Sequence, residues 1–211
     1  MSKVTVIIPY REDRGWLQQA IDSVPLWCQL IVEQGDDNKS VVFNRALKKA
    51  TGDIIKVLDE DDVLVTKNLA KLVDKLCQGY DFVHANAIII DKNGNEKGRF
   101  IPKIKEPSFS DIYKFNHIYN PTVIYRRDVF ERLGGYDESL VKSQDWEYHL
   151  RCLSGGMKIG YIDSYVTYYR RHKEQITSKL YSKNNQVRQQ IKNKYAGGQR
   201  PSNPAQTSSR D

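Results

Sequence analysis

The chain has 211 residues, of which 39% are hydrophobic and 28% are charged, and its formal net charge is +7. This composition excludes a collagen-like, a wholly disordered and a membrane-spanning chain, and the length suits one domain with an appendage. Three widely separated cysteines without a CxxC pair argue against a zinc cluster or a disulfide framework.

Strands and helices are predicted to alternate over the first 80 residues. The chain begins in the β-branched run Val4–Ile8 without the longer apolar stretch of a signal peptide, so we expect a buried strand in a cytoplasmic protein. The alternation continues with helical spacing of apolar residues at 16–24, 41–50 and 66–76 and with strand-like runs at 30–32 and 54–58. This order is typical of a parallel sheet with crossover helices.

The second half of the chain mixes strands with shorter helices. Asn93-Gly94 is a strong hairpin signal that follows the strand-like run 82–90. Further strands are predicted at 122–125 and 166–169, and further helices at 128–133 and from Ser143 or Gln144 to Leu153. We therefore expect one Rossmann-like α/β domain over residues 1–175, with a mainly parallel central sheet flanked by helices.

Two basic segments follow this domain. Apolar residues at helical spacing predict a basic amphipathic helix over 176–195, and the Gly-, Pro-, Ser- and Gln-rich residues 196–211 are predicted to be disordered. Residues 164–211 contain ten Lys or Arg and two acids, a charge of +8, so residues 1–163 carry −1. Such a tail suits an anionic membrane surface or DNA, and a solvated tail that only aids solubility fits the charge equally well. Packing of the apolar stripe on the domain's own core is the favoured alternative to membrane contact.

An acidic cluster ends one of the predicted parallel strands. Asp59-Glu60-Asp61-Asp62 follows the apolar run 54–58, and ligands of such sheets bind beyond the carboxyl ends of the strands. Adjacent carboxylates repel one another unless a cation neutralises them, and hard oxygen ligands select Mg²⁺ or Mn²⁺. An ion held here would bridge the protein to a diphosphate. The alternative is an acidic loop that caps the next helix.

Two further groups could carry chemistry. Asp145 is expected in the first turn of a helix beside Trp146, where a carboxylate shielded from water can act as a general base on a hydroxyl; simple capping of the helix is the alternative. Glu147 and Arg151 have the spacing of an ordinary helix-surface pair. His172 lies just beyond the last predicted strand, where both a structural role and a role as a metal ligand are possible.

Taken in chain order, these segments resemble the family 2 glycosyltransferases, which have the GT-A fold. The matching segments are Val4–Pro9, Asn44–Leu47, Ala50–Gly52, the DxD-type motif Leu58–Asp62, Arg126–Arg132, Leu133–Glu138, Gln144–Trp146 and Tyr169–His172. Each segment alone is a weak signal, but the ordered set over about residues 3–175 is specific. The resemblance implies an inverting, metal-dependent enzyme that moves a sugar from a nucleotide-sugar donor to an acceptor hydroxyl.

The resemblance also implies roles for individual residues. Asp145 would be the catalytic base, and Asp61 would hold Mn²⁺ or Mg²⁺ on the donor diphosphate. His172 would be a further contact to the metal or to the diphosphate, and Asp62 and Trp146 would support the site. The donor nucleotide would be bound by Pro9, Tyr10, Arg11, Glu12, Glu33, Gln34, Asn44, Asp59 and Glu60.

One segment departs from the family pattern. The family commonly has two acids and a glycine after the second strand, one acid of which contacts the base, whereas this chain has Val32-Glu33-Gln34-Gly35-Asp36-Asp37. Glu33 or Asp37 could serve, or Gln34 could replace the second acid because an amide both donates and accepts hydrogen bonds. UDP, GDP and dTDP therefore all stay open as the donor nucleotide.

Two hypotheses on the acceptor, and one non-catalytic alternative, follow from these features. Many family members act on polysaccharide precursors carried by lipid phosphates, which implies a glycan or lipid-linked acceptor and peripheral membrane contact. A modified base in DNA is an alternative, because a basic tail and several nearby tyrosines could track phosphates and stack on bases. A non-catalytic nucleotide- or nucleic-acid-binding module is the alternative from another class, and the joint presence of Asp59, Asp61, Asp145 and His172 argues against it.

Overall fold

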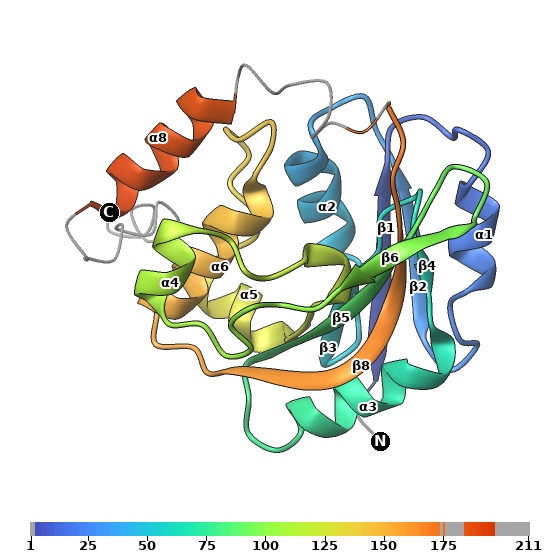
Figure 1. Ribbon diagram of the computed structural model, residues 1–211, viewed down its shortest axis with the longest axis horizontal. Helices are drawn as coiled ribbons and strands as arrows, with labels where there is room; N and C mark the ends of the chain where they lie inside the picture. Colours follow the sequence, from blue (N-terminus) through green and yellow to red (C-terminus); the bar gives the residue numbers. More distant parts are fainter. Residues whose placement is uncertain (1–2, 174, 176–183, 197–211) are drawn as a thin grey trace, which may run out of the picture.

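An eight-stranded mixed sheet runs through the part of the chain that the computed structural model describes, which comprises residues 3–173, 175 and 184–196 (Figure 1). Its strand order is β2-β1-β3-β7-β5-β8-β4, and β6 pairs with β5 outside this path. The strands are β1 (Val4–Tyr10), β2 (Gln29–Gln34), β3 (Ile54–Val57), β4 (Val63–Leu64), β5 (Phe82–Ile90), β6 (Glu96–Phe100), β7 (Ile124–Arg126) and β8 (Ile159–Arg170).

The sheet is parallel only in part. Strands β2, β1 and β3 are parallel neighbours, as the alternation of strands and helices predicts, and β5 pairs in parallel with β8. Strand β7 lies antiparallel between β3 and β5. Strand β4 pairs antiparallel with β8, and β6 pairs antiparallel with β5. The single α/β domain is confirmed, but the sheet is mixed rather than mainly parallel. The parallel half still brings the carboxyl ends of β1 and β3 to one edge.

The helices cover both faces of this sheet. They are α1 (Leu17–Asp22), α2 (Lys39–Leu47), α3 (Thr66–Leu76), α4 (Phe109–Lys114), α5 (Arg127–Leu133), α6 (Gln144–Ser154) and α8 (Asn184–Tyr195), with a 3₁₀ turn, η1, at Asn120–Thr122. Helix α4, which the sequence pattern does not predict, begins with a capping box formed by Ser108 and Asp111. Among the described residues, no helix combines the length and the apolar character that crossing a bilayer requires.

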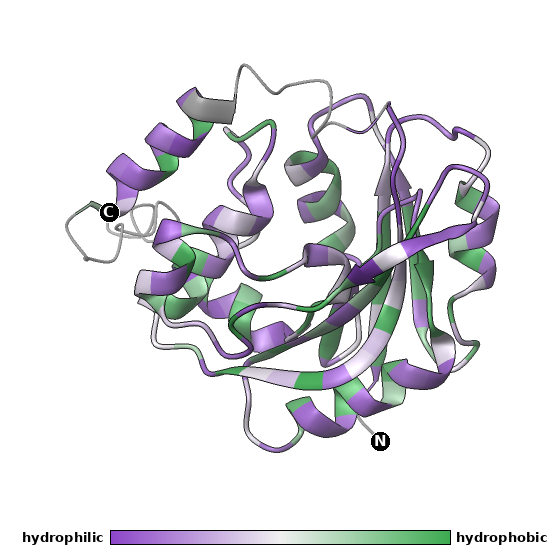
Figure 2. Ribbon diagram, in the orientation of Figure 1, coloured by the Kyte–Doolittle hydropathy of each residue, from purple (hydrophilic) through white to green (hydrophobic). Residues whose placement is uncertain are grey.

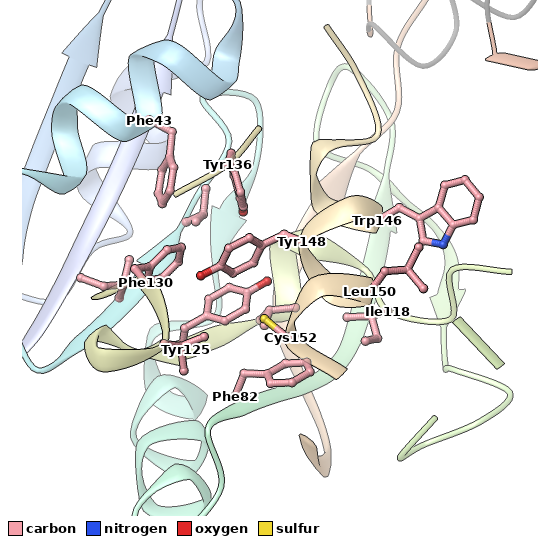
Figure 3. Packing of buried hydrophobic residues seen from close by; sticks show 14 of the residues in the cluster. Phe43, Phe82, Ile118, Tyr125, Phe130, Tyr136, Trp146, Tyr148, Leu150 and Cys152 are labelled. Atoms are coloured by element: carbon pink, nitrogen blue, oxygen red, sulfur yellow. The ribbon is translucent and has the colours of Figure 1, made fainter. Parts of the chain in front are cut away.

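Buried side chains form one apolar layer on each side of the sheet. Because successive residues of a strand point to opposite faces, Ile7 packs with α2 and α6, whereas Val6 and Ile8 pack with α1 and α3. Figure 2 shows hydrophobic residues on several strands of the sheet, a largely hydrophilic β6 and mixed character on the helices. On the α6 side the rings of Tyr125 and Phe130 pack against Tyr148 (Figure 3).

Helix α8 packs on the body of the domain. Its residues Val187, Ile191 and Tyr195 are buried in the core cluster on the α6 side, so this part of the apolar stripe faces the protein itself, as the favoured alternative to membrane contact expects. The phenol of Tyr195 donates a 2.8 Å hydrogen bond to Glu147, which is fully buried. The Glu147–Arg151 pair, expected on the helix surface, therefore lies in the interior. Residues 176–183 of the predicted helix and 197–211 of the predicted disordered tail lie outside the described residues.

Candidate active site

A cavity of about 1050 Å³ opens at the edge of the sheet where β3 ends. Five of the residues proposed from sequence line it: Asp59, Glu60, Asp61, Asp145 and His172. The remaining lining residues are Arg14, Lys39, Asn116, Ile118, Tyr119, Asn120, Pro121, Lys142, Ser143, Gln144, Tyr169, Arg171, Lys173 and Gln175. Segments from the first half of the chain and from its second half thus line the same cavity.

The acidic cluster forms a tight turn after β3. The backbone N–H of Asp62 donates to the carbonyl of Asp59, and carboxylate oxygens of Asp59, Asp61 and Asp62 lie within 4.8 Å of one another. Asp62 is fully buried and accepts a hydrogen bond from the backbone N–H of Arg170 at 2.9 Å. The Arg170 guanidinium donates to the carbonyl of Asp61 at 2.8 Å. Strand β8 therefore fixes the turn that presents the three acids.

Two cations partly balance these acids. Lys39 pairs with Asp59, and Arg14 lies 3.5 Å from Glu60. Asn38 caps α2 through its side chain, which places Lys39 in the first turn, where a positive charge opposes the helix dipole. Burial would lower the pKa of Lys39, but the charges of Asp59 and the neighbouring acids outweigh it and raise that pKa. This unfavourable helix position is explained by the acids that Lys39 faces.

The carboxyl groups remain crowded despite these cations. Burial first, and then the neighbouring acids, raise the pKa of Glu60 to about 7 and also raise the pKa of Asp61 and Asp62. One carboxylate oxygen of Asp62 and Nδ1 of His172 are buried without a partner among the described residues. Mn²⁺ can be coordinated by both carboxylate oxygens and an imidazole nitrogen, whereas Mg²⁺ would be coordinated by the carboxylate oxygens. The residues present therefore fit a divalent cation.

His172 lies directly beside the acidic turn. Its Nε2 is 2.8 Å from an oxygen of Asp61, and its side chain is only 5% exposed. The ring of Trp16 packs against the imidazole with centroids 4.6 Å apart. Trp16 also lies under the guanidinium of Arg170. The resemblance places His172 with Asp61 at the metal or the diphosphate, and the fold brings these two side chains into contact.

Asp145 enters the cavity from a different element. It lies in the first turn of α6, which follows Ser143 in a left-handed conformation with φ of 57°. Such a backbone is strained for a residue other than glycine, and strain of this kind gathers at functional sites. Burial raises the pKa of Asp145. Trp146 is buried outside the cavity lining, and its indole N–H donates to the carbonyl of Ile112 at 2.7 Å. In Figure 3 the indole points away from the packed rings of Tyr125 and Tyr148.

Other residues expected at the donor nucleotide do not line this cavity. Glu33 is buried and ion-paired, and hydrogen bonds from Lys49 and Arg45 lower its pKa. The Asn44 amide bonds both the N–H and the carbonyl of Tyr136. The two supporting residues expected from the resemblance, Asp62 and Trp146, also lie outside the cavity lining. The nucleotide-binding candidates outside it are Pro9, Tyr10, Arg11, Glu12, Glu33, Gln34 and Asn44. Contact of these candidates with a nucleotide stays a prediction.

Sequence patterns missed most of the cavity's cations and amides. Lys39 carried a usable signal, because a lysine directly after a helix cap is unfavourable unless it meets an acid. Arg171 stands beside His172 and was in the matching segment, although no role was assigned to it. Asn116 lies between α4 and η1, in a stretch where no element was predicted, and carried no signal.

Two histidines, His84 and His149, are fully buried in the domain, and they predict an acid-sensitive fold. Burial lowers the pKa of His84 to about 4 and that of His149 to about 3. Since the unfolded chain takes up these protons near pH 6.5, the stabilising contribution is complete above that pH and is lost as the pH falls toward the folded-state values. Each histidine should lower the free energy of unfolding by about 1.4 kcal/mol per pH unit in this window.

Urea denaturation at pH values of about 7, 6 and 5 checks this expectation by comparing wild type with His149→Asn. As the pH falls, the free energy of unfolding of the variant should decrease by about 1.4 kcal/mol per pH unit less than that of wild type. Glu60, whose raised pKa acts in the opposite direction, is present in both proteins and cancels. Equal slopes in the two proteins would contradict a neutral, buried His149.

Comparison with solved structures places this fold. The 1–349 fragment of S. aureus TarS, solved with UDP-GlcNAc, matches with a TM-score of 0.67 and 17% identity over 84% of this chain and 61% of that fragment. The mannosyltransferase PcManGT of Pyrobaculum calidifontis, solved with GDP-Man and Mn²⁺, matches with a TM-score of 0.59 and 15% identity over 89% of this chain and 61% of that one. These likenesses show the GT-A fold.

Sequence comparison gives the family. An uncharacterized glycosyltransferase of Methanocaldococcus jannaschii, MJ1057, is 29% identical over 161 residues, or 67% of this chain and 54% of that protein. The GalNAc(5)-diNAcBac-PP-undecaprenol beta-1,3-glucosyltransferase of Campylobacter jejuni is 29% identical over 49% of this chain and 43% of its own. The chain thus spans about half the length of these relatives. The model of the family described as glycosyl transferase family 2 matches residues 25–134, more than half of the 211 residues, and the chain belongs to that family.

Proposed function

We propose that this domain is the catalytic part of an inverting, metal-dependent glycosyltransferase that moves a sugar from a nucleoside diphosphate to an acceptor hydroxyl. The observation that carries the proposal is the convergence of Asp145 with the Asp59, Asp61 and His172 cluster on one cavity. A carboxylate that can take a proton thus faces carboxylates that can hold a metal-bound diphosphate. The alternative of capping acids at two unrelated helices would not require them to share a space.

Asp59, Asp61 and His172 would hold Mn²⁺ or Mg²⁺, with the buried Asp62 behind them. Such an ion, when bound, supplies positive charge that stabilises the leaving nucleoside diphosphate. The ammonium of Lys39 and the guanidinium of Arg14 face the same acids and add to the positive field. Together these groups favour departure of the diphosphate from the sugar.

Asp145 would supply the other half of the reaction. Its carboxylate takes the proton of the acceptor hydroxyl while the hydroxyl oxygen forms a bond to the anomeric carbon. The bond from that carbon to the diphosphate oxygen breaks, and its electron pair leaves with the diphosphate. One base and one displacement give inversion at the anomeric carbon and need no covalent enzyme intermediate.

The donor nucleotide would lie beyond the ends of β1 and β2, beside the residues expected there from the resemblance. TarS with UDP-GlcNAc and PcManGT with GDP-Man support a nucleotide-sugar donor without choosing between uridine and guanosine. For the acceptor we propose a polysaccharide or lipid-linked glycan precursor, supported by the undecaprenol-linked substrate in the name of the C. jejuni relative. A cytoplasmic location peripheral to the membrane would give access to such an acceptor.

A thermal-shift screen tests the proposal. UDP, GDP, dTDP, CDP and their sugars are each added with and without Mn²⁺. A ligand at about 100 times its dissociation constant adds roughly 2.7 kcal/mol to the free energy of unfolding, which a melting curve detects. One nucleotide class should stabilise the protein, and only with the metal. The absence of any shift across the screen would contradict the proposal and favour a non-catalytic module.

A further inference from the structure

Asn116 connects the candidate base to the interior of the domain. It lines the cavity between α4 and η1, and its Nδ2 donates to Oδ2 of Asp145 at 3.3 Å. Its Oδ1 accepts the backbone N–H of Ile118 at 3.2 Å. Because a backbone N–H can only donate, this contact fixes which end of the amide is oxygen. The NH₂ group of Asn116 therefore faces the carboxylate.

His149 continues this connection one helical turn after Asp145. Its Nδ1 is 3.3 Å from Oδ1 of Asn116, and since that oxygen only accepts, Nδ1 must carry the hydrogen. Its Nε2 is then an acceptor, and the phenol of Tyr125 donates to it at 3.0 Å. Burial keeps the imidazole neutral and the phenol protonated, because it lowers the pKa of His149 to about 3 and raises that of Tyr125. The four groups form one directed chain that ends on Asp145.

The inner end of this chain is rigid. Tyr125 and His149 are fully buried, and the imidazole stacks over the ring of Phe82 with centroids 6.2 Å apart. Tyr125 belongs to β7 and Phe82 to β5, and both rings lie in the core beside α6 (Figure 3). Because residues of the sheet hold His149 in place, His149 can in turn fix the position of Asn116.

We propose that Asn116 and His149 are positioning residues for the transfer reaction, which hold Oδ2 of Asp145 and so keep its carboxylate in place for the acceptor hydroxyl. This inference rests on the proposed function, in which Asp145 is the base. Catalytic geometry of this kind must be held closely, and a displacement of about 1 Å can cost on the order of 100-fold in rate. A neutral amide serves better than a cation, because a cation in contact would make the carboxylate a weaker base.

Other charges also act on Asp145 and stay constant across the variants below. Burial raises the pKa of Asp145, and hydrogen bonds from the backbone N–H groups of Trp146 and of Asp145 itself lower it. From the facing elements, the charge of Lys39 lowers this pKa and that of Asp59 raises it. The remaining charged or titratable residues that line the cavity are Arg14, Glu60, Asp61, Tyr119, Lys142, Tyr169, Arg171, His172 and Lys173. Loss of the Asn116 hydrogen bond, which favours the ionised form, should therefore appear as an upward shift of the Asp145 pKa against an unchanged background.

Asn116→Ala is the first test. We expect kcat to fall by about 10- to 100-fold, with the donor KM unchanged. The acid limb of the kcat profile should move up by roughly half a unit to one unit. A merely structural role would lower the melting temperature without moving this limb. An unchanged kcat and acid limb in a variant that melts like wild type would overturn the inference.

His149 offers a matched pair of variants. In Asn the amide nitrogen occupies the position of Nδ1, so His149→Asn keeps a donor to Asn116, whereas His149→Gln places its amide near Nε2 and keeps only the contact with Tyr125. We expect His149→Asn to retain kcat within about threefold and His149→Gln to resemble Asn116→Ala. Equal kcat values in the two variants, at equal melting temperatures, would contradict the role of His149.

A readout independent of turnover separates this inference from the proposed function. The pKa of the Asp145 carboxyl is measured by ¹³C NMR titration in wild type and in Asn116→Ala, and it should rise by roughly half a unit to one unit in the variant. Failure of wild type to turn over any nucleotide-sugar would refute the proposed function whatever the titration shows. An unchanged Asp145 pKa would refute the inference even if wild type is an active transferase.

Discussion

Replacement of Asp145 by Asn is expected to lower the rate of sugar transfer by about 10²- to 10⁴-fold, the usual contribution of a general base. Asparagine has nearly the same shape, so the cavity and the contact with Asn116 should change little. Its amide cannot take a proton from a hydroxyl at neutral pH. Donor affinity, measured by calorimetry, should remain within about twofold because other residues would hold the donor diphosphate in the proposed reaction.

The pH profile gives a second readout for this variant. Burial raises the pKa of Asp145, and the base acts only when ionised, so wild-type kcat should rise with pH through that raised value. The variant should lose this acid limb. Asp128→Asn is the matched control, since Asp128 is also an acid in the first turn of a helix but lies outside the cavity lining. Equal losses of donor binding and turnover in Asp145→Asn would contradict its assignment as the base.

The acids at the end of β3 could be placed from sequence because local pattern and topology agree there, whereas the candidates at the ends of β1 and β2 lie outside the cavity lining. Alternating periods of strand and helix predict parallel neighbours, and the carboxyl ends of parallel strands must share an edge. Asp59, Asp61, Asp145 and His172 do line one cavity. The last two follow from the ordered resemblance rather than from the pattern, since helix spacing alone did not distinguish a base from a capping acid at Asp145.

The second half of the chain was harder because long-range pairing decides its structure. Strand β7 inserts antiparallel between β3 and β5, and nothing local to Ile124–Arg126 encodes that position. Lys56 lies in a strand that the sequence predicts to be buried, and this lysine is itself fully buried, with its side-chain nitrogen bonded to the carbonyl of Pro121. Burial lowers the pKa of Lys56 to about 7. Such partners are visible only after the strands are assembled.

The same limit applies to charged pairs that look like surface features. The spacing of Glu147 and Arg151 fits an exposed helix pair, yet Glu147 is fully buried under α8 and also bonded by Lys194 and Tyr195. Glu33, expected to contact a base, already forms ion pairs with Arg45 and Lys49. Sequence spacing shows that two groups can meet, but burial and competing partners decide what the contact does.

Asp61→Asn is expected to abolish metal-dependent donor binding. The amide keeps the size of the side chain but removes the negative charge that would hold Mn²⁺ against the diphosphate. The stabilisation by nucleotide with Mn²⁺, roughly 2.7 kcal/mol at about 100 times the dissociation constant in wild type, should disappear at the same concentrations. Retention of a Mn²⁺-dependent shift in the variant would contradict the role of Asp61 as a ligand.

The stability of the metal-free variant distinguishes a ligand from a structural acid. Burial and the charge of Asp59 raise the pKa of Asp61, so its ionised form is held at a cost, and Asp61→Asn should melt no lower than wild type without metal. Asp91→Asn is the opposite control. Although desolvation would raise the pKa of Asp91, hydrogen bonds from Asn95 and other partners lower it to about 2, so its loss should lower the melting temperature and leave the Mn²⁺-dependent shift intact. An acid whose removal spares the fold but ends metal-dependent binding is placed for function, because the folded state gains nothing else from keeping its charge.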